Sequence, residues 1–358
     1  MQTRRSHKNQ FGPCVGIIGG GQLGRMLVAA AAKLGYRTCV YAESELDPAV
    51  CVTNFSVVGS FSNNKTLQEF ASCVDVAIVE FENIPISFME EIQQTVRVCP
   101  GRRALYIAQN RIREKEHIKS LGWAVADFAT VSSPAELQSA LQVIGYPSVL
   151  KTAESGYDGK GQYILKDPKD TEILSHITHD QCYVLEKLVD IREELSIIVA
   201  VDGNGYHEFF PIAKNTHVDG VLYSSVAPAG ISRSMELQIQ KVALSVAISL
   251  ELVGILAIEF FVTGDNRLLV NEIAPRPHNS GHWSIDACNV SQFEQLVRIA
   301  CGLPLRKVHM TSPCMMQNIF GDNILNSEIY EDPRNSISLY GKLPRARRKM
   351  GHINTLMY

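Results

Sequence analysis

Residues 15–25 read VGIIGGGQLGR, an apolar segment that runs into a cluster of glycines. Gly19, Gly21 and Gly24 have the G-x-G-x-x-G spacing of a nucleotide-binding turn between a strand and a helix. Glu43 follows 19 residues after Gly24, where an acid that binds a ribose hydroxyl is expected in NAD-binding proteins. However, glycines and a helix N-terminus accommodate any phosphate. The motif alone therefore leaves open an NAD site, another nucleotide site and a structural turn.

The segments around this turn predict an α/β domain with a doubly wound parallel sheet. Short apolar runs alternate with segments of helical periodicity, so the ligand site is expected at the carboxyl ends of the strands. The expected strands are residues 14–19, 37–43 and 75–81, and the expected helices are 23–34 and 64–73. A further helix is predicted between Asn110, a suitable N-cap, and Gly122, a suitable stop.

Length and composition predict a globular protein of two or three domains. The chain has 358 residues, a net charge of -3 and 46% hydrophobic residues, which gives no electrostatic reason to expect nucleic acid or an anionic membrane as a partner. Its nine cysteines are scattered without a C-x-x-C pair, which favours reduced thiols in the cytoplasm over disulfides or structural zinc. The apolar segment 242–262 contains several polar residues and predicts a buried helix, a turn and a buried strand. We expect domains at 1–110, 111–183 and 184–358.

A second glycine-rich motif, KTAESGYDGKGQ, occupies residues 151–162. Its three glycines and Lys160 lie between two predicted strands, which is typical of a flexible flap whose N–H groups close over a polyphosphate. A plain hairpin loop is the structural alternative. Lys151 argues against that alternative, because a lysine at the end of a buried strand needs an anionic partner. The order of residues is not that of a P-loop.

The third motif is a predicted hairpin, EFFVTGDNRLLVNE, at residues 259–272. A turn centred on Asp265 and Asn266 pairs residues whose numbers add up to 531, so Glu259 and Glu272 are expected opposite each other. Two buried carboxylates repel each other unless a cation lies between them. Mg²⁺ bound to nucleotide phosphates is the natural cation.

The segment APRPHNSGHW follows at residues 274–283. His278 and His282 have the spacing of metal ligands on a helix, but Pro275, Pro277 and Gly281 argue against a helix there. We therefore interpret the segment as a substrate-binding loop rather than a second metal site. A structural loop with hydrogen-bonded histidines is the alternative.

Five motifs in order, GGGQLGRM, VEFENIP, GYDGKGQ, NEIAPRPHNSGHW and RKMGHIN, cover residues 15–354 and resemble the 5-(carboxyamino)imidazole ribonucleotide synthase family. The resemblance implies an ATP-grasp fold with an N-terminal Rossmann-like (pre-ATP-grasp) parallel-sheet domain. It also implies a magnesium-dependent ligase of purine biosynthesis, cytoplasmic and homodimeric. Such an enzyme uses ATP and bicarbonate to carboxylate aminoimidazole ribonucleotide through carboxyphosphate, releasing ADP and phosphate.

The resemblance also implies roles for individual residues. The expected ATP contacts are Arg111, Lys151, the flap (Gly156, Tyr157, Asp158, Gly159, Lys160, Gly161, Gln162), the hinge (Glu186, Lys187, Leu188, Val189), Glu194, His217, Asn271 and Glu272. The expected metal ligands are Glu259 and Glu272. The expected substrate contacts are Gly21, Gln22, Leu23, Glu82, Tyr157, Arg276, His278, Asn279, Lys342, Arg348 and Lys349, with the C-terminal cations beside the glycine turn. Lys151, Tyr157, Arg276 and His278 are the expected catalytic residues.

Three other functions remain open at this point. A formate-dependent glycinamide ribonucleotide transformylase shares the fold and uses a ribonucleotide substrate. An NAD oxidoreductase is compatible with the glycine turn alone. A non-catalytic binding protein is the third alternative, although the retention of both Glu259 and Glu272 argues against it.

Overall fold

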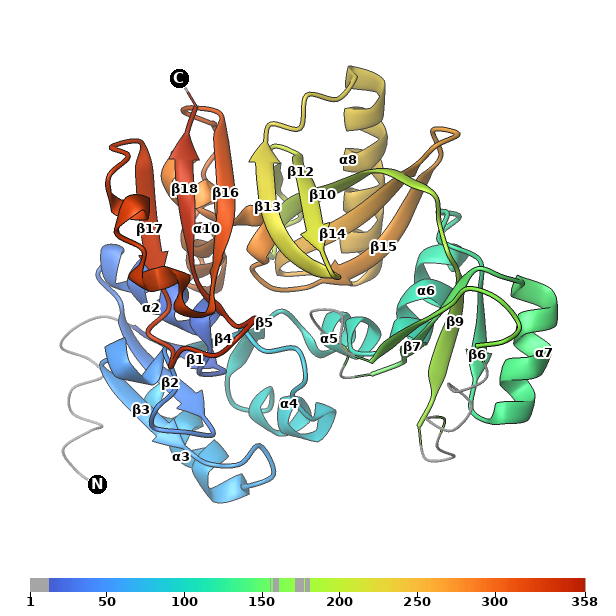
Figure 1. Ribbon diagram of the computed structural model, residues 1–358. Coiled ribbons are helices and arrows are strands. Elements are labelled where there is room, and N and C mark those ends of the chain that lie inside the picture. Colours follow the sequence, from blue (N-terminus) through green and yellow to red (C-terminus); the bar gives the residue numbers. More distant parts are fainter. Residues whose placement is uncertain (1–12, 155, 157–160, 171–176, 178–180, 358) are drawn as a thin grey trace.

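The computed structural model describes residues 13–154, 156, 161–170, 177 and 181–357. Within these residues the chain forms a five-stranded, a four-stranded and a nine-stranded β-sheet. Figure 1 shows the five-stranded sheet (blue) and the four-stranded sheet (green) on opposite sides of the molecule, with the nine-stranded sheet reaching across between them. None of the described helices combines the length and the apolar character needed to cross a bilayer.

The N-terminal sheet is parallel throughout, as predicted, with the strand order β3-β2-β1-β4-β5. Val15 and Ile17 pack on one face with α2, and Ile18 packs on the other face with α3 and α4. Because both faces are covered, the strands are apolar without interruption. The elements are β1 (Cys14–Ile18), α2 (Gln22–Lys33), β2 (Arg37–Ala42), η1 (Val50–Val52), β3 (Phe55–Val58), α3 (Asn64–Cys73), β4 (Val76–Val79), α4 (Ile86–Ile92), β5 (Arg97–Cys99) and α5 (Arg102–Ala108).

Helix α6 (Arg111–Ser120) connects the N-terminal sheet to the next unit. Its predicted cap is confirmed: Asn110 Oδ1 accepts hydrogen bonds from the backbone N–H groups of Ile112 and Arg113. The predicted stop is confirmed as well, since Gly122 follows the helix with a φ of +81°. Arg111 is the first residue of α6, so the cap fixes the backbone position from which its side chain extends.

The four-stranded sheet is antiparallel, with the order β6-β9-β7-β8. Its elements are β6 (Phe128–Val131), α7 (Pro134–Ile144), β7 (Ser148–Thr152), β8 (Gln162–Leu165) and β9 (Tyr183–Lys187). Pairing of β7 with both β8 and β9 sets Lys151 beside Gln162 on one side and Val184 on the other. The glycine-rich motif therefore connects two neighbouring strands, as expected.

The nine-stranded sheet is antiparallel, with the order β15-β14-β10-β12-β13-β16-β18-β17 and β11 paired to β10. Residues 242–262 form the end of a helix, a turn and most of a buried strand, as predicted. The elements up to residue 300 are β10 (Ile191–Val201), β11 (His207–Phe209), β12 (Ala213–Val218), β13 (Val221–Ala227), α8 (Arg233–Ser249), β14 (Gly254–Thr263), β15 (Leu268–Ala274), η3 (Asn279–Gly281), α9 (Ser284–Ala287) and α10 (Gln292–Ala300).

The C-terminal segment extends this sheet, although the sequence analysis assigned no strand to it. Three strands and two short 3₁₀ helices follow α10: β16 (Cys314–Phe320), η4 (Gly321–Leu325), η5 (Ser327–Tyr330), β17 (Asn335–Leu339) and β18 (Lys349–Leu356). β16 pairs with β13, and β18 lies between β16 and β17. Figure 1 shows these strands (red) next to the N-terminal sheet.

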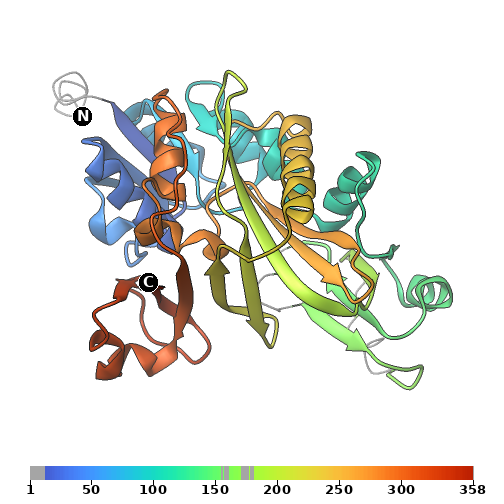
Figure 2. The same cartoon turned by 90° about the horizontal axis from the view of Figure 1, so that it is seen from above.

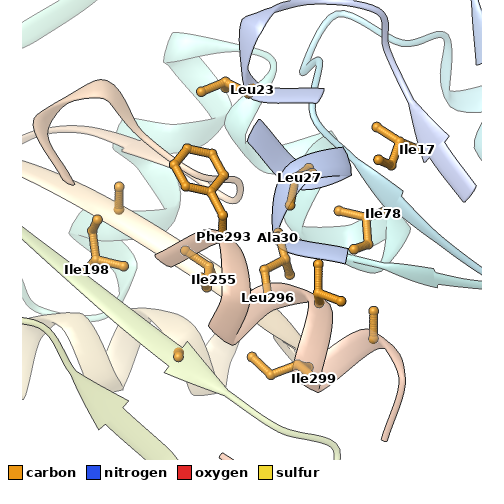
Figure 3. Close-up of a cluster of buried hydrophobic side chains, with 14 of the residues drawn as sticks. Ile17, Leu23, Leu27, Ala30, Ile78, Ile198, Ile255, Phe293, Leu296 and Ile299 are labelled. Atoms are coloured by element: carbon orange, nitrogen blue, oxygen red, sulfur yellow. The ribbon is translucent and has the colours of Figure 1, made fainter. Parts of the chain in front are cut away.

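Helix α10 joins the N-terminal domain to the nine-stranded sheet. Figure 3 shows a core made by side chains of the N-terminal domain, of α10 and of strands β10 and β14: Ile17, Leu23, Leu27, Ala30, Ile78, Ile198, Ile255, Phe293, Leu296 and Ile299. All are at most 8% exposed. Full burial of a large apolar side chain stabilises a fold by roughly 1.5–3 kcal/mol. The two parts are thus packed together through α10, which lies beside the N-terminal sheet in Figure 2.

Candidate functional site

Two carboxylates face each other across the β14–β15 hairpin. Glu259 pairs with Glu272, as predicted. The predicted register also holds for Ile258 and Ile273, but it is wrong between the glutamates and the turn, because a bulge at Asn271 shifts the pairing and Phe260 lies opposite Val270. The turn is also longer than expected, with the backbone N–H of Thr263 donating to the carbonyl of Arg267. The bulge compensates for the longer turn, so the carboxylate pair still forms.

His278 completes a cluster with these two glutamates. Its Nδ1 lies 3.8 Å from Glu259 Oε1, and one ligand atom from each of the three residues lies within 4.8 Å of the others. Burial and the charge of Arg276 lower the pKa of His278 to about 3, so its ring is neutral. Burial and the charge of Glu272 raise the pKa of Glu259. Paired carboxylate oxygens in a buried setting fit Mg²⁺, and a neutral imidazole beside them adds no charge.

His282, the other histidine of the loop, does not join the cluster. Its Nδ1 contacts Gln292 Nε2 at 3.0 Å, and its ring lies 4.9 Å from the ring of His352. The segment between the two histidines forms the short 3₁₀ helix η3, preceded by His278 as its N-cap. The two histidines therefore do not form a pair of metal ligands, although their spacing along the chain would suit one on a helix. This agrees with the prediction of a loop.

Arg111 connects the carboxylates to a group of buried charges. Its guanidinium lies 3.3 Å from Glu272 Oε2. Burial opposes ionisation of Glu272, but Arg111 and the other nearby cations outweigh it and lower the pKa of this carboxyl. Glu272 is thus charged, and its negative charge repels a second charge on Glu259. An added divalent cation would relieve this repulsion.

Lys151 has the anionic partner that its buried position required. Its Nζ donates to Glu186 Oε2 at 2.9 Å, and the Nζ of Lys115 lies 3.3 Å from the other oxygen. Burial disfavours a charged Glu186, yet the two lysines lower its pKa to about 2. The sequence analysis missed Lys115. Its spacing of four residues from Arg111 on one helix was the available signal, since such residues share a face.

Most of the remaining described residues of the predicted nucleotide site lie on β8, β9, β10 and β12 or directly beside these strands. Glu194 on β10 and His217 on β12 are hydrogen-bonded side chain to side chain. Lys187 Nζ donates to the carbonyl of Tyr146, and a cavity of about 350 Å³ is lined in part by Lys187, Leu188 and Val189. Gly161 takes a φ of +71° before β8. Tyr157, Asp158, Gly159 and Lys160 of the predicted flap lie outside the described residues.

An acidic side chain fills the N-terminal glycine turn. Glu80, directly after β4, accepts a hydrogen bond from the N–H of Gly21 at 2.6 Å. Gly19 has a φ of +116°, and a Cβ at this position would lie 2.6 Å from Glu80 Oε1. Glycine is thus required by both conformation and space. Glu80 is a site residue that was not predicted from the sequence, although an acid at the end of the strand beside β1 was a signal.

Glu82 and Arg276 form a two-point ion pair between the N-terminal domain and the loop after β15. Nε of Arg276 lies 3.0 Å from Oε1 of Glu82, and Nη2 of Arg276 donates to Oε2 of Glu82 at 3.3 Å. Asn279 lies nearby in sequence, and neither polar atom of its buried amide has a hydrogen-bond partner among the described residues. A buried amide without partners is costly, so this site is suited to a polar ligand.

The three C-terminal cations divide into two groups. Burial raises the pKa values of Asp47 and Glu80, and the charges of Arg348 and Lys342, respectively, oppose these shifts. Both acids line the glycine turn, since a Cβ on Gly20 would touch Asp47. Lys349 instead lowers the pKa of His278, after burial and Arg276, and so lies towards the carboxylate cluster. The C-terminal segment thus reaches both regions.

Comparison with known proteins places the chain in a family. Its residues 13–109 match the ribonucleotide synthetase preATP-grasp domain, residues 116–293 the ATP-grasp domain, and residues 314–357 the phosphoribosylaminoimidazole carboxylase C-terminal domain. N5-carboxyaminoimidazole ribonucleotide synthase of Bacillus subtilis is 39% identical over 96% of this chain and 91% of its own length. The Brucella melitensis enzyme is 40% identical over 96% of both chains.

The chain belongs to the N5-carboxyaminoimidazole ribonucleotide synthase family. It is an ATP-dependent enzyme with the ATP-grasp fold, as the resemblance implied. The Staphylococcus aureus enzyme complexed with ADP superposes with a TM-score of 0.93 at 35% identity, covering 98% of this chain and 94% of that chain. An Aspergillus clavatus enzyme in complex with ADP and 5-aminoimidazole ribonucleotide gives 0.89 at 29% identity, covering 97% and 94%.

Membership of this family also decides between the alternatives left open by the sequence. Neither an NAD oxidoreductase nor a formate-dependent transformylase is favoured. The glycine turn agrees with this outcome, since its N–H at Gly21 is engaged by the Glu80 carboxylate in the structure. The G-x-G-x-x-G spacing therefore reflects a strand-to-helix turn of the pre-ATP-grasp domain rather than a nicotinamide site.

Glu114, a buried residue of α6, is expected to make the stability of the fold depend on pH. Burial raises its pKa to about 8 from 4.5. The unfolded chain releases this proton near pH 4.5 and the folded chain near pH 8, so between these values the unfolded state binds fewer protons and stability falls as pH rises. We expect Glu114→Gln to remove this loss and to be more stable than the parent at pH 8 by up to about 4 kcal/mol.

Urea unfolding at pH 5, 6, 7 and 8 measures this effect. The gain should be small at pH 5 and grow with each step. Glu116→Gln is the matched control, because Glu116 is an exposed residue of the same helix and should give a constant difference. A Glu114→Gln difference that does not change between pH 5 and 8 would contradict the assignment of a neutral carboxyl.

Proposed function

We propose that this chain carries out the reaction of its family: carboxylation of the exocyclic amine of aminoimidazole ribonucleotide with ATP and bicarbonate. The products are carboxyaminoimidazole ribonucleotide, ADP and phosphate. The observation that carries the proposal is the joining of two sites. The glutamate and lysine cluster suited to phosphoryl transfer meets, through Arg276 and His278, a substrate region lined by Glu82 and Asn279.

On the nucleotide side, cations balance the charge of the transferring phosphoryl group. Glu186 holds Lys151 and Glu272 holds Arg111 in place, so these cations need little reorganisation when phosphates bind. The proposed contacts to ATP are Arg111, Lys151, Gly156 to Gln162, Glu186 to Val189, Glu194, His217, Asn271 and Glu272. Lys151 lies at the flap end of β7, which suits contact with the phosphates.

Glu259 and Glu272 are the proposed ligands of Mg²⁺. A magnesium ion held by these carboxylates would neutralise part of the negative charge on the nucleotide phosphates. The repulsion between the paired carboxylates, which raises the pKa of Glu259, is the property of this structure that favours a cation. Asn271, forced out of register by the bulge, is a further oxygen donor of the right type beside them.

On the substrate side, Arg276 is the proposed partner of bicarbonate and of carboxyphosphate, the reactive intermediate. Its ion pair with Glu82 fixes the guanidinium plane. The ring of His278 is neutral and its Nδ1 accepts from the Ser280 N–H, so its Nε2–H is proposed to donate a hydrogen bond to bicarbonate or carboxyphosphate. Tyr157 and the flap are proposed to exclude water, since carboxyphosphate would otherwise be hydrolysed. The ribonucleotide contacts are proposed to be Gly21, Gln22, Leu23, Asn279, Lys342, Arg348 and Lys349.

The domain division and the setting of the enzyme are part of the proposal. We keep domains at 1–110, 111–183 and 184–358, which the separate five-stranded and four-stranded sheets support. The C-terminal strands then belong with the third domain because they extend its sheet. Cysteine thiols at all nine positions support a cytoplasmic location. The family resemblance supports a homodimer.

Phosphate release tests the proposed reaction directly. We expect release with ATP, Mg²⁺, bicarbonate and aminoimidazole ribonucleotide together, and a loss of most of it when any one is omitted. Formate with glycinamide ribonucleotide should give no release above background. Release that is equally fast without the imidazole ribonucleotide, or only with formate and glycinamide ribonucleotide, would contradict the proposal.

A further inference from the structure

Gln292, the first residue of α10, holds the backbone of His278 on both sides. The N–H of His278 donates to Gln292 Oε1 at 2.9 Å, and Gln292 Nε2 donates to the carbonyl of His278 at 2.8 Å. The same Nε2 lies 3.0 Å from Nδ1 of His282. Gln292 is 0% exposed. Both polar atoms of this buried amide therefore contact the loop after β15.

The loop is shaped around this side chain. The N–H of Gln292 donates to Ser284 Oγ at 3.1 Å, and that hydroxyl donates to the carbonyl of Gly281 at 2.6 Å. A Cβ on Gly281 would lie 3.1 Å from Gln292 Oε1, so the loop leaves room for the amide and little else. Ser280 then contacts the His278 ring at Nδ1, 2.9 Å away. Backbone and ring of His278 are fixed by one connected network.

We propose that Gln292 is a positioning residue for His278: by fixing its backbone, it sets the imidazole against Glu259 and Glu272. The effect on the ring rests on the geometry alone, and the effect on turnover rests on the proposed function. Helix α10 also packs against α2, and Phe293 and Leu296 of α10 belong to the same core as Leu27 and Ala30 of α2 (Figure 3). The amide therefore ties the proposed ribonucleotide domain to the loop that carries His278.

A second glutamine of α10 supplies a matched control. Gln295 is also 0% exposed, and it holds Arg306 in the same way: its Nε2 donates to the Arg306 carbonyl at 2.7 Å, and its Oε1 accepts from the Arg306 N–H at 3.1 Å. Arg306 belongs to the segment between α10 and β16, and its side chain reaches Glu294 rather than the carboxylate cluster. Loss of this second clamp costs stability without a direct effect on His278.

The test compares Gln292→Met and Gln295→Met in the full chain. We expect similar losses of thermal stability, because each removes one buried two-point amide clamp. At a temperature where both are folded, Gln292→Met should lower kcat for phosphate release about 10- to 100-fold with the KM for ATP within about twofold of the parent. Gln295→Met should keep both parameters within about twofold.

A measurement independent of activity completes the test. With ¹⁵N-labelled histidine, the ring signals of His278, assigned with His278→Gln, should move or broaden in Gln292→Met and stay unchanged in Gln295→Met. Unchanged His278 signals in Gln292→Met, or equal changes in both variants, would overturn the inference. An inactive parent enzyme would contradict only the proposed function, because the ring signals still decide the role of Gln292. If Gln292→Met does not fold, Gln292→Glu, which keeps the volume, is measured in the same way.

Discussion

Replacing Glu272 by Gln should lower turnover about 1,000-fold while the protein remains folded. Glu272 is one of the two paired acids and also the partner of Arg111 at 3.3 Å. The neutral amide leaves one carboxylate for the proposed magnesium ion and leaves Arg111 unbalanced. Both changes reduce the charge compensation available to the transferring phosphoryl group. The measurement is single-turnover phosphate release at saturating ATP, with circular dichroism to confirm the fold.

Glu193→Gln is the matched control for this experiment. Glu193 lies on β10 of the same sheet, but its carboxylate pairs with Lys214 and Arg192 at the surface. Exposed ion pairs contribute little, so activity should stay within about twofold. A folded Glu272→Gln enzyme with near-parental turnover would refute the metal assignment. A large loss in Glu193→Gln as well would mean that the effect is a general one on the sheet.

The double variant Lys342→Met and Arg348→Met should raise the KM for aminoimidazole ribonucleotide about 30- to 1,000-fold, or roughly 2–4 kcal/mol. Lys342 acts on Glu80, as Arg276 also does, and Arg348 acts on Asp47 at the glycine turn. We expect them to hold the phosphate of the ribonucleotide together with the N–H groups of the turn. The KM for ATP should change less than about threefold, because Lys151 and Arg111 remain.

Arg347→Met controls for the loss of positive charge from the same run of residues. Arg347 pairs with the exposed Asp219 at 2.8 Å and so points elsewhere. It should leave both KM values close to those of the parent. A parallel rise of both KM values in the double variant, or no rise in either, would contradict a phosphate site at the glycine turn.

Local patterns were sufficient to predict the N-terminal sheet and the carboxylate pair. The parallel sheet follows from alternating apolar strands and helices. The N-cap of helix α6 at Asn110 follows from residue type. Glu259 and Glu272 come from one hairpin, and their pairing agrees with the prediction because the longer turn and the bulge at Asn271 offset each other. The bulge at Asn271 escaped prediction because nothing in a short apolar strand marks which residue loses its partner.

Contacts between distant segments could not be derived in this way. Glu186 and Lys115 are 71 positions apart, and their pairing depends on how α6 lies against β9. Glu80 reaches Gly21 because β4 lies beside β1, an order that the sequence pattern leaves open. The strands after residue 310 contain polar residues at buried positions, such as Asn318 in β16 and His352 and Asn354 in β18, so they lack the apolar pattern that marks a strand.

The placement of β18 has a consequence for synthesis on the ribosome. The glycine turn emerges near residue 21, and Lys342 emerges only after some 320 further residues, which takes roughly 15–65 s at about 5–20 residues per second. During that interval Glu80 is already present to occupy the N–H of Gly21. A nascent chain that has reached residue 320 also presents β16 as an unpaired sheet edge until β18 is added. Premature termination between these strands would therefore yield a product that lacks Arg348, a proposed partner of the ribonucleotide phosphate, and is prone to aggregation.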